Sequence, residues 1–144
     1  MRFAVLGFAL VLLAAILPAS AIAQTPIAEG QVWTFRGATA DTARVAIQKI
    51  EPWGRGEAVH ISVYGLPAIG GFNGEVSHMP FDRKALERSL DTLTVETPLA
   101  DIGFAEGYQQ WTSASGGVFT LSVAEALKAV LGVMFEAPRP ASPI

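Results

Sequence analysis

The sequence predicts an α+β fold, in which a mainly antiparallel sheet of four to six strands packs on two or three helices. Three adjacent segments in the first half of the chain alternate apolar and polar residues, as strands do when one face lies in a core. Two later segments place apolar side chains at helical spacing directly after a helix-capping sequence. Because short links join the three alternating segments, they are expected to form an antiparallel meander.

The three strands of this meander are predicted at residues 31–36, 42–50 and 58–66. Residues 52–56 contain a proline and two glycines, which predicts a loop between the second and third strands. The third strand alternates most clearly, with Val59, Ile61 and Val63 on one face and His60, Ser62 and Tyr64 on the other.

A fourth strand is predicted at residues 75–81, after a long glycine-rich connection at residues 65–74. Side chains two residues apart share a face of a strand, so His78 is expected on the same face as Val76 and Pro80.

The first helix is predicted from Asp82, which is suited to cap its N-terminus. Phe81 and Leu86 stand where a hydrophobic staple forms, and the apolar stripe continues through Leu90 and Leu93. A short strand is then expected at residues 94–97.

A second helix is predicted at residues 101–113, because Phe104, Tyr108 and Trp111 follow each other at helical spacing. A strand is expected at residues 118–121. Ser122 and Glu125 then form a capping box, which predicts the start of a last, largely apolar helix.

The N-terminus has the pattern of a secretory signal peptide, predicted at residues 1–23. A positive charge at Arg2 precedes an apolar run, and Ala21 and Ala23 before Gln24 fit the small-residue cleavage rule. The protein is therefore expected to be exported, to the periplasm or outside the cell, with no stable membrane span after cleavage. The alternative is an uncleaved helix that anchors the chain. Residues 24–136 then form one domain, and the proline-rich residues 137–144 a disordered tail.

Charge and cysteine content exclude several classes of function. The net charge is −3, so the chain lacks the basic surface that nucleic acids require. It contains no cysteine, which excludes disulfides, thiol nucleophiles and zinc–thiolate sites. No sequence feature predicts a cofactor.

Five short strings, taken in their order along the chain, resemble a set of small uncharacterised bacterial proteins. The strings are residues Glu29 to Trp33, Gly70 to Phe72, His78 to Phe81, Glu106 to Tyr108 with Trp111, and Gly117 to Thr120. The resemblance covers most of the chain after the leader. It implies no activity.

The two histidines, His60 and His78, lie on segments that would be neighbouring strands if the third and fourth strands pair as a hairpin. Glu75 or Asp82 could then add a carboxylate, although the spacing matches no known metal motif and no metal site is predicted. The ordinary roles are a surface histidine and a hydrogen-bonded edge histidine. An enzyme that uses both histidines stays an alternative, for which both should line one pocket.

No catalytic residue is assigned from the sequence. Ser62 shares a strand face with His60, but a triad also requires a carboxylate and an oxyanion donor. The chain contains no nucleophile elbow.

The loops supply the main binding candidates. The connection at residues 65–74 carries Leu66, Ile69 and Phe72 with few charges, and Trp53 lies in the loop at residues 52–56. Such apolar loops either fold back over the core or contact a partner. The sequence therefore favours a non-enzymatic module that binds a protein or another component of the cell envelope.

A small-ligand carrier is the third interpretation. Its pocket would lie between sheet and helices and be lined by Trp33, Phe35, Phe104 and Trp111, whose ordinary role is core packing. The sequence does not indicate the oligomeric state.

Overall fold

The computed structural model describes residues 25–100 and 102–135, so the predicted signal segment and proline-rich tail lie outside the described residues. One five-stranded antiparallel sheet packs with three helices, which confirms the predicted α+β class. Within the described ranges, no helix is long and apolar enough to cross a bilayer. The elements are β1 (Val32–Phe35), β2 (Arg44–Trp53), β3 (Gly56–Tyr64), β4 (Val76–Asp82), α1 (Arg83–Ser89), β5 (Leu90–Leu93), α2 (Phe104–Ser113) and α3 (Val123–Phe135).

The strands lie in the order β4-β3-β2-β1-β5, and every neighbouring pair is antiparallel. The predicted meander of three strands is confirmed, with β4 added beside β3. After α1 the chain returns to the opposite edge of the sheet, where β5 pairs with β1. The predicted loop at residues 52–56 is shorter than expected, because β2 runs to Trp53 and β3 begins at Gly56.

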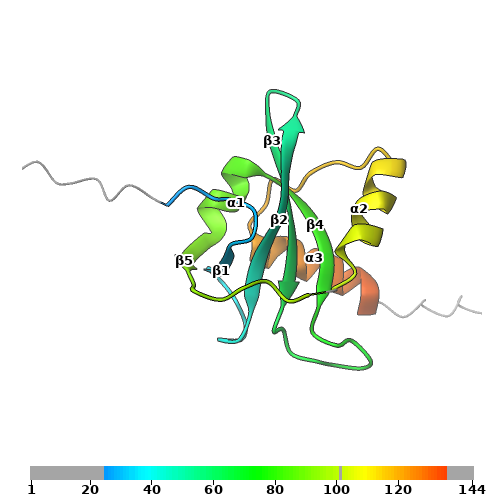
Figure 1. Cartoon of the computed structure of the whole chain (residues 1–144). Helices are drawn as coiled ribbons and strands as arrows, with labels where there is room; N and C mark the ends of the chain where they lie inside the picture. Colours follow the sequence, from blue (N-terminus) through cyan, green and yellow to red (C-terminus); the bar gives the residue numbers. More distant parts are fainter. Residues whose placement is uncertain (1–24, 101, 136–144) are drawn as a thin grey trace, which may run out of the picture.

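The main core lies between the sheet and the pair of helices α1 and α3 (Figure 1). Its centre is formed by β-branched side chains of β2 and β3 and by Phe81, Leu86 and Val123 from the later elements. Helix α2 covers the opposite face, where the smaller cluster of Val32, Ala46 and Tyr64 lies against Ile102. The sheet therefore separates two unequal layers.

A β-bulge at Gln48 changes which side chains of β2 face α2. Ile47 is opposite Ile61, but Lys49 is opposite His60, so one extra residue stands in β2. A bulge reverses the alternation beyond it. Ile50 therefore packs against the main core, and Glu51 faces α2.

A second bulge lies in β4, where Ser77 and His78 both stand opposite Ser62. The expectation that Val76 shares a face with His78 is wrong for this reason. Val76 packs against the main core, whereas His78 faces α2.

Both predicted capping sites are confirmed, and the helix expected at residues 101–113 begins at Phe104. The Asp82 carboxylate accepts a hydrogen bond from the Ala85 N–H at 3.1 Å. At α3, the Glu125 N–H donates to Ser122 Oγ at 3.2 Å and the Ser122 N–H donates to Glu125 Oε2 at 3.0 Å, which closes the capping box.

Three predicted elements differ from the structure. Helix α1 ends at Ser89, and Leu90 to Leu93 form β5, so the helix does not reach Leu93 and the expected strand at residues 94–97 is misplaced. Pairing with the free edge of β1 overrides the helical spacing of these leucines. The expected strand at residues 118–121 is reduced to one parallel bridge between Phe119 and Phe81.

Candidate functional site

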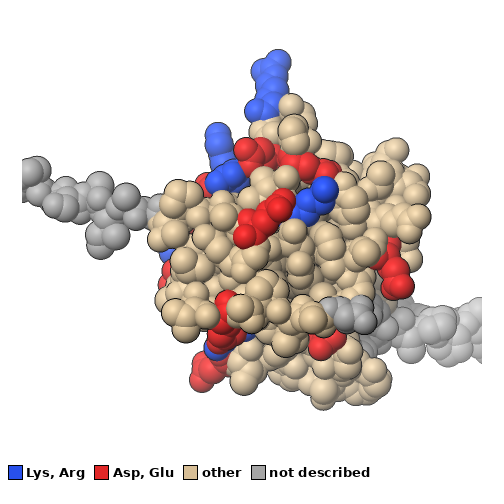
Figure 2. Space-filling view, viewed as in Figure 1, with Lys and Arg blue, Asp and Glu red and all other residues tan. Residues whose placement is uncertain are grey.

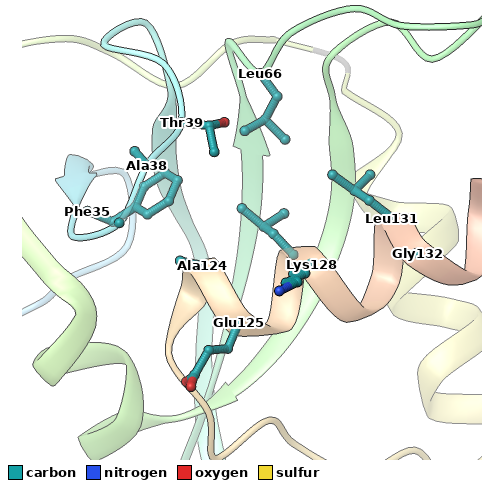
Figure 3. A pocket seen from close by; sticks show the side chains of 11 residues that line it. Phe35, Ala38, Thr39, Leu66, Ala124, Glu125, Lys128, Leu131 and Gly132 are labelled. Atoms are coloured by element: carbon teal, nitrogen blue, oxygen red, sulfur yellow. The ribbon is translucent and has the colours of Figure 1, made fainter.

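A cavity of about 550 Å³ opens beside α3 on the main-core side of the sheet (Figure 3). Phe35 and Leu66 line it from the sheet side, and Leu127 and Leu131 line it from α3. The turn at residues 37–39, between β1 and β2, closes one end. We call this the α3 cavity. Its size and its apolar lining are those of a small-molecule site.

Two charged side chains stand at the rim of the α3 cavity. Glu125 is occupied by the capping box, since its carboxylate accepts from both the backbone N–H and the hydroxyl of Ser122, and these bonds lower its pKa. Lys128 is exposed, and no carboxylate among the described residues lies within ion-pair distance of it. The rim therefore presents one unpaired cation beside an apolar cavity.

The four predicted loop contacts do not gather at one site. Leu66 is half-buried, packs against the main core and lines the α3 cavity. Ile69 and Phe72 exchange two backbone hydrogen bonds of 3.1 and 2.9 Å, which close the loop on itself and leave Ile69 63% exposed. Trp53 packs against Trp111 of α2 with ring centroids 5.2 Å apart and the ring planes tilted by 44°. The connection at residues 65–74 thus folds back through Leu66 and projects at Ile69.

The two histidines meet on the face that α2 covers. His60 Nδ1 and His78 Nε2 are 2.9 Å apart, and the two rings are stacked with centroids 5.1 Å apart. His60 is fully buried, whereas His78 is partly buried and lines a separate cavity of about 330 Å³ at the β4 edge. The strand pairing expected from the sequence therefore brings the rings together, but His60 lies under the helix.

The carboxylate beside this pair is Glu51 and not Glu75 or Asp82. Glu51 Oε1 lies 3.3 Å from His60 Nε2, and Glu51 Oε2 accepts a hydrogen bond of 2.7 Å from the Tyr108 hydroxyl. Asp82 caps α1 and Glu75 accepts from Asn73. The bulge at Gln48 brings Glu51 to this face, and a sequence pattern that assumes regular alternation cannot show it.

The hydrogen-bonding pattern fixes the direction of the chain Tyr108–Glu51–His60–His78. A carboxylate only accepts, so His60 Nε2 carries the hydrogen that it donates to Glu51. Neutral His60 then accepts at Nδ1, and His78 donates from Nε2. Nδ1 of His78 is left as the position for an added proton.

Burial and neighbouring charges move the pKa values of this group. Burial lowers the pKa of His60 against the opposing effect of Glu51, and burial with the nearby His60 lowers the pKa of His78 to about 4. Burial alone would raise the pKa of Glu51, but the bonds from Tyr108 and His60 outweigh it and the pKa lies below its ordinary value. The Tyr108 pKa is raised by its bond to Glu51. The histidines are therefore neutral and Glu51 is ionised at neutral pH.

The other sequence candidates have structural partners. Ser62 donates to the Ser77 carbonyl oxygen at 2.7 Å and accepts from Gln48 Nε2 at 3.1 Å, so the hydroxyl is not bonded to His60. Across the part of the chain that the structure describes, no group of three or more acidic or histidine side chains could hold a metal ion.

The four aromatic residues of the expected carrier pocket lie on opposite faces of the sheet. Trp33 and Phe35 belong to the main core, whereas Phe104 and Trp111 contact the histidine pair from α2. They do not line one cavity. Of the four, Phe35 alone lines the α3 cavity, and the leucines on α3 that complete it carry the apolar spacing expected of a core stripe.

Charge on the surface shown in Figure 2 is mixed in sign. Acidic and basic side chains are interspersed there, and several lie near the end of the molecule where β2 turns into β3.

Comparison with known proteins finds no match to a family model, a curated protein or a solved structure. The resemblance to small bacterial proteins therefore stays a prediction.

Proposed function

We propose that this protein is a non-enzymatic binding module whose α3 cavity takes the hydrocarbon chain of an anionic amphiphile, such as a fatty acid. The single observation that supports this function is the apolar cavity of about 550 Å³ with Lys128 at its rim. An apolar cavity favours a hydrocarbon chain, because burial of its surface is favourable by about 25 cal/mol per Å². An unpaired ammonium group favours a carboxylate or phosphate head.

The rim chemistry decides between an anionic and a cationic ligand. Among the described residues that line this cavity, Glu125 is the only other charged one, and its carboxylate already accepts from Ser122. Lys128 is therefore the charge that a ligand head can pair with. The pair is exposed, so it contributes less than about 1 kcal/mol and sets preference more than affinity.

Substitution of Leu131 by tryptophan tests this function, because the larger side chain occupies the α3 cavity. We expect the Leu131→Trp variant to bind dodecanoate at least about tenfold more weakly than the unmodified protein, measured by isothermal titration. Val133→Trp is the matched control, since Val133 is 77% exposed on the same helix and does not line the cavity. Equal dodecanoate affinity in all three proteins would contradict the site.

Substitution of Lys128 by glutamine tests the charged head group of the ligand separately from its hydrocarbon chain. This variant should bind dodecanoate a few-fold more weakly and dodecanol with unchanged affinity, because the alcohol has no charge to pair. Binding of neither ligand by the unmodified protein would reject the amphiphile and turn the search to a protein partner.

Export belongs to the same proposal. Anionic amphiphiles are components of a cell envelope, and residues 1–23 have the pattern of a secretory leader. We expect the mature chain, recovered from the periplasm or the medium, to have an intact mass that begins at Gln24. A mass that includes residues 1–23 would instead support the anchored alternative.

A further inference from the structure

We propose that the His60–His78 pair is a proton-sensitive lock for α2: the pair holds the helix on the sheet while it carries at most one proton, and a second proton separates the rings and releases the helix. This inference concerns the face of the sheet opposite the α3 cavity. It does not depend on the proposed ligand.

The histidine pair is a main attachment point of helix α2, beside the contacts of Trp111 with Trp53 and of Tyr108 with Glu51. The helix has no buried residue, and its N-cap, Gly103, provides no side-chain cap. Its aromatic side chains meet the imidazoles instead. Trp111 and Tyr108 lie with ring centroids 4.6 and 5.0 Å from His60, and Phe104 lies 5.5 Å from His78.

The rest of the domain does not need α2 in place. The main core is built by the sheet with α1 and α3, and none of its residues comes from α2. Elements with few buried apolar contacts open at lower free energy than the core does. Release of α2 can therefore occur while the main core stays folded.

The geometry of the pair accommodates one proton and not two. With one added proton, one imidazole donates across the 2.9 Å contact and the other accepts. With two, both facing nitrogen atoms carry hydrogens and both rings are cationic, so the hydrogen bond is replaced by repulsion. Because Tyr108 and Trp111 of α2 contact both rings, separation of the rings disturbs the contacts that hold the helix.

The charged and titratable groups around the pair come from β2 and α2. Glu51 of β2 bonds to His60 and offsets one positive charge, and Tyr108 of α2 bonds to the same carboxylate. Lys49 of β2, whose ammonium group lies 5.2 Å from the Tyr108 ring, opposes protonation of His60. One carboxylate therefore faces a lysine and two histidines, which is too little negative charge for two imidazolium ions.

The direction of the pH effect follows from the pKa values. In the docked state the pKa of His78 is about 4 and that of His60 is lowered, whereas a released histidine titrates near its ordinary 6.5. Between these values the released state binds more protons than the docked state. Docking is therefore strongest above pH 6.5 and weakens as the pH falls toward 4, by about tenfold per pH unit for each extra proton bound.

Amide hydrogen exchange of the unmodified protein, corrected for intrinsic rates, tests the lock. Between pH 7.5 and pH 4.5 we expect the protection of residues 104–113 to fall at least tenfold, while that of residues 123–135 is kept. Loss of protection in both helices together would show global unfolding and overturn the proposal. Unchanged protection of α2 would overturn it as well.

His78→Gln is the deciding variant, because its amide can donate to neutral His60 and, after rotation, accept from protonated His60. We expect α2 of this variant to stay protected at pH 4.5. Glu106→Gln is the matched control, since it removes an exposed titratable group from the same helix and should behave as the unmodified protein. Equal acid sensitivity of His78→Gln and the unmodified protein would reject the lock.

Glu51→Gln keeps the proposal testable if His78→Gln does not fold. The glutamine can still accept from His60 through its oxygen and donate through its NH2 group to the Tyr108 hydroxyl, but it removes the negative charge that offsets the first proton. Release of α2 should then begin at higher pH than in the unmodified protein. An unchanged or lower pH of release would contradict the lock.

Discussion

Replacement of Gly65 by alanine should lower the free energy of unfolding by about 3 kcal/mol. Gly65 has a φ of +70°, in the left-handed region that alanine adopts with strain. An added Cβ would stand 2.0 Å from the Thr42 carbonyl oxygen, which belongs to the backbone and cannot rotate away. The Thr42 hydroxyl also donates to the Gly65 carbonyl at 2.6 Å, so the two segments are held together at this point.

Gly30→Ala is the matched control, because Gly30 also has a positive φ, +87°, but nothing lies within 4 Å of its added Cβ. This variant should lose only the conformational cost, about 1 kcal/mol. Urea unfolding at pH 7.5 measures the free energy of unfolding of both variants, and in thermal unfolding Gly65→Ala should melt roughly 10 °C below the unmodified protein. Equal losses in the two variants would show that the backbone contact with Thr42 is without effect.

Replacement of Gly107 by alanine should detach α2 at neutral pH, although alanine is the better helix former. Helix propensity alone predicts a gain of about 1 kcal/mol. An added Cβ, however, would lie 2.6 Å from the His78 Cβ, which is fixed to the β4 backbone. The helix must move outward, and its aromatic contacts with the histidines are then lost. Overpacking of this kind costs about 1–3 kcal/mol and outweighs the propensity.

Gly132→Ala provides the control, because this glycine lies in α3 and its added Cβ meets nothing within 4 Å. It should stabilise the protein by up to about 1 kcal/mol. Amide exchange at pH 7.5 should show loss of protection confined to residues 104–113 in Gly107→Ala. Protection of α2 equal to that of the unmodified protein would mean that the helix tolerates the methyl group and does not pack as described.

The sequence was sufficient to predict those helices and strands that are specified by their own residues, through alternation or through a capping side chain. Alternation gave the strands that became β1 and β3, and capping side chains gave the starts of α1 and α3 at Asp82 and Ser122. The local pattern assigned the residues of β5 to a helix, because Leu90 and Leu93 have helical spacing. The edge of β1 with which they pair is remote in sequence. Such tertiary pairing is invisible to a local pattern.

The site was predictable to a similar degree. Pairing of the third and fourth strands was enough to bring His60 and His78 together. Their carboxylate was not predictable, since Glu51 reaches this face only through a bulge that leaves no mark in the composition of β2. The α3 cavity was also missed, because its leucines have the spacing of an ordinary core stripe, and of its lining only Phe35 and Leu66 were singled out, each for a different site.

The bulge at Gln48 gives β2 two alternating patterns that are out of phase with each other. Before the bulge Val45 and Ile47 supply the main core, and after it Ile50 does, one position away from where strict alternation would place it. The side-chain pattern of β2 therefore requires the bulge as long as the extra residue is present. Regular pairing that kept every residue would direct Glu51 into the apolar core and Ile50 under α2, whereas loss of one residue between Ile47 and Ile50 would leave both on their present faces. By giving up regular pairing at one point, β2 thus keeps Ile50 and Glu51 on the faces where each has its partners.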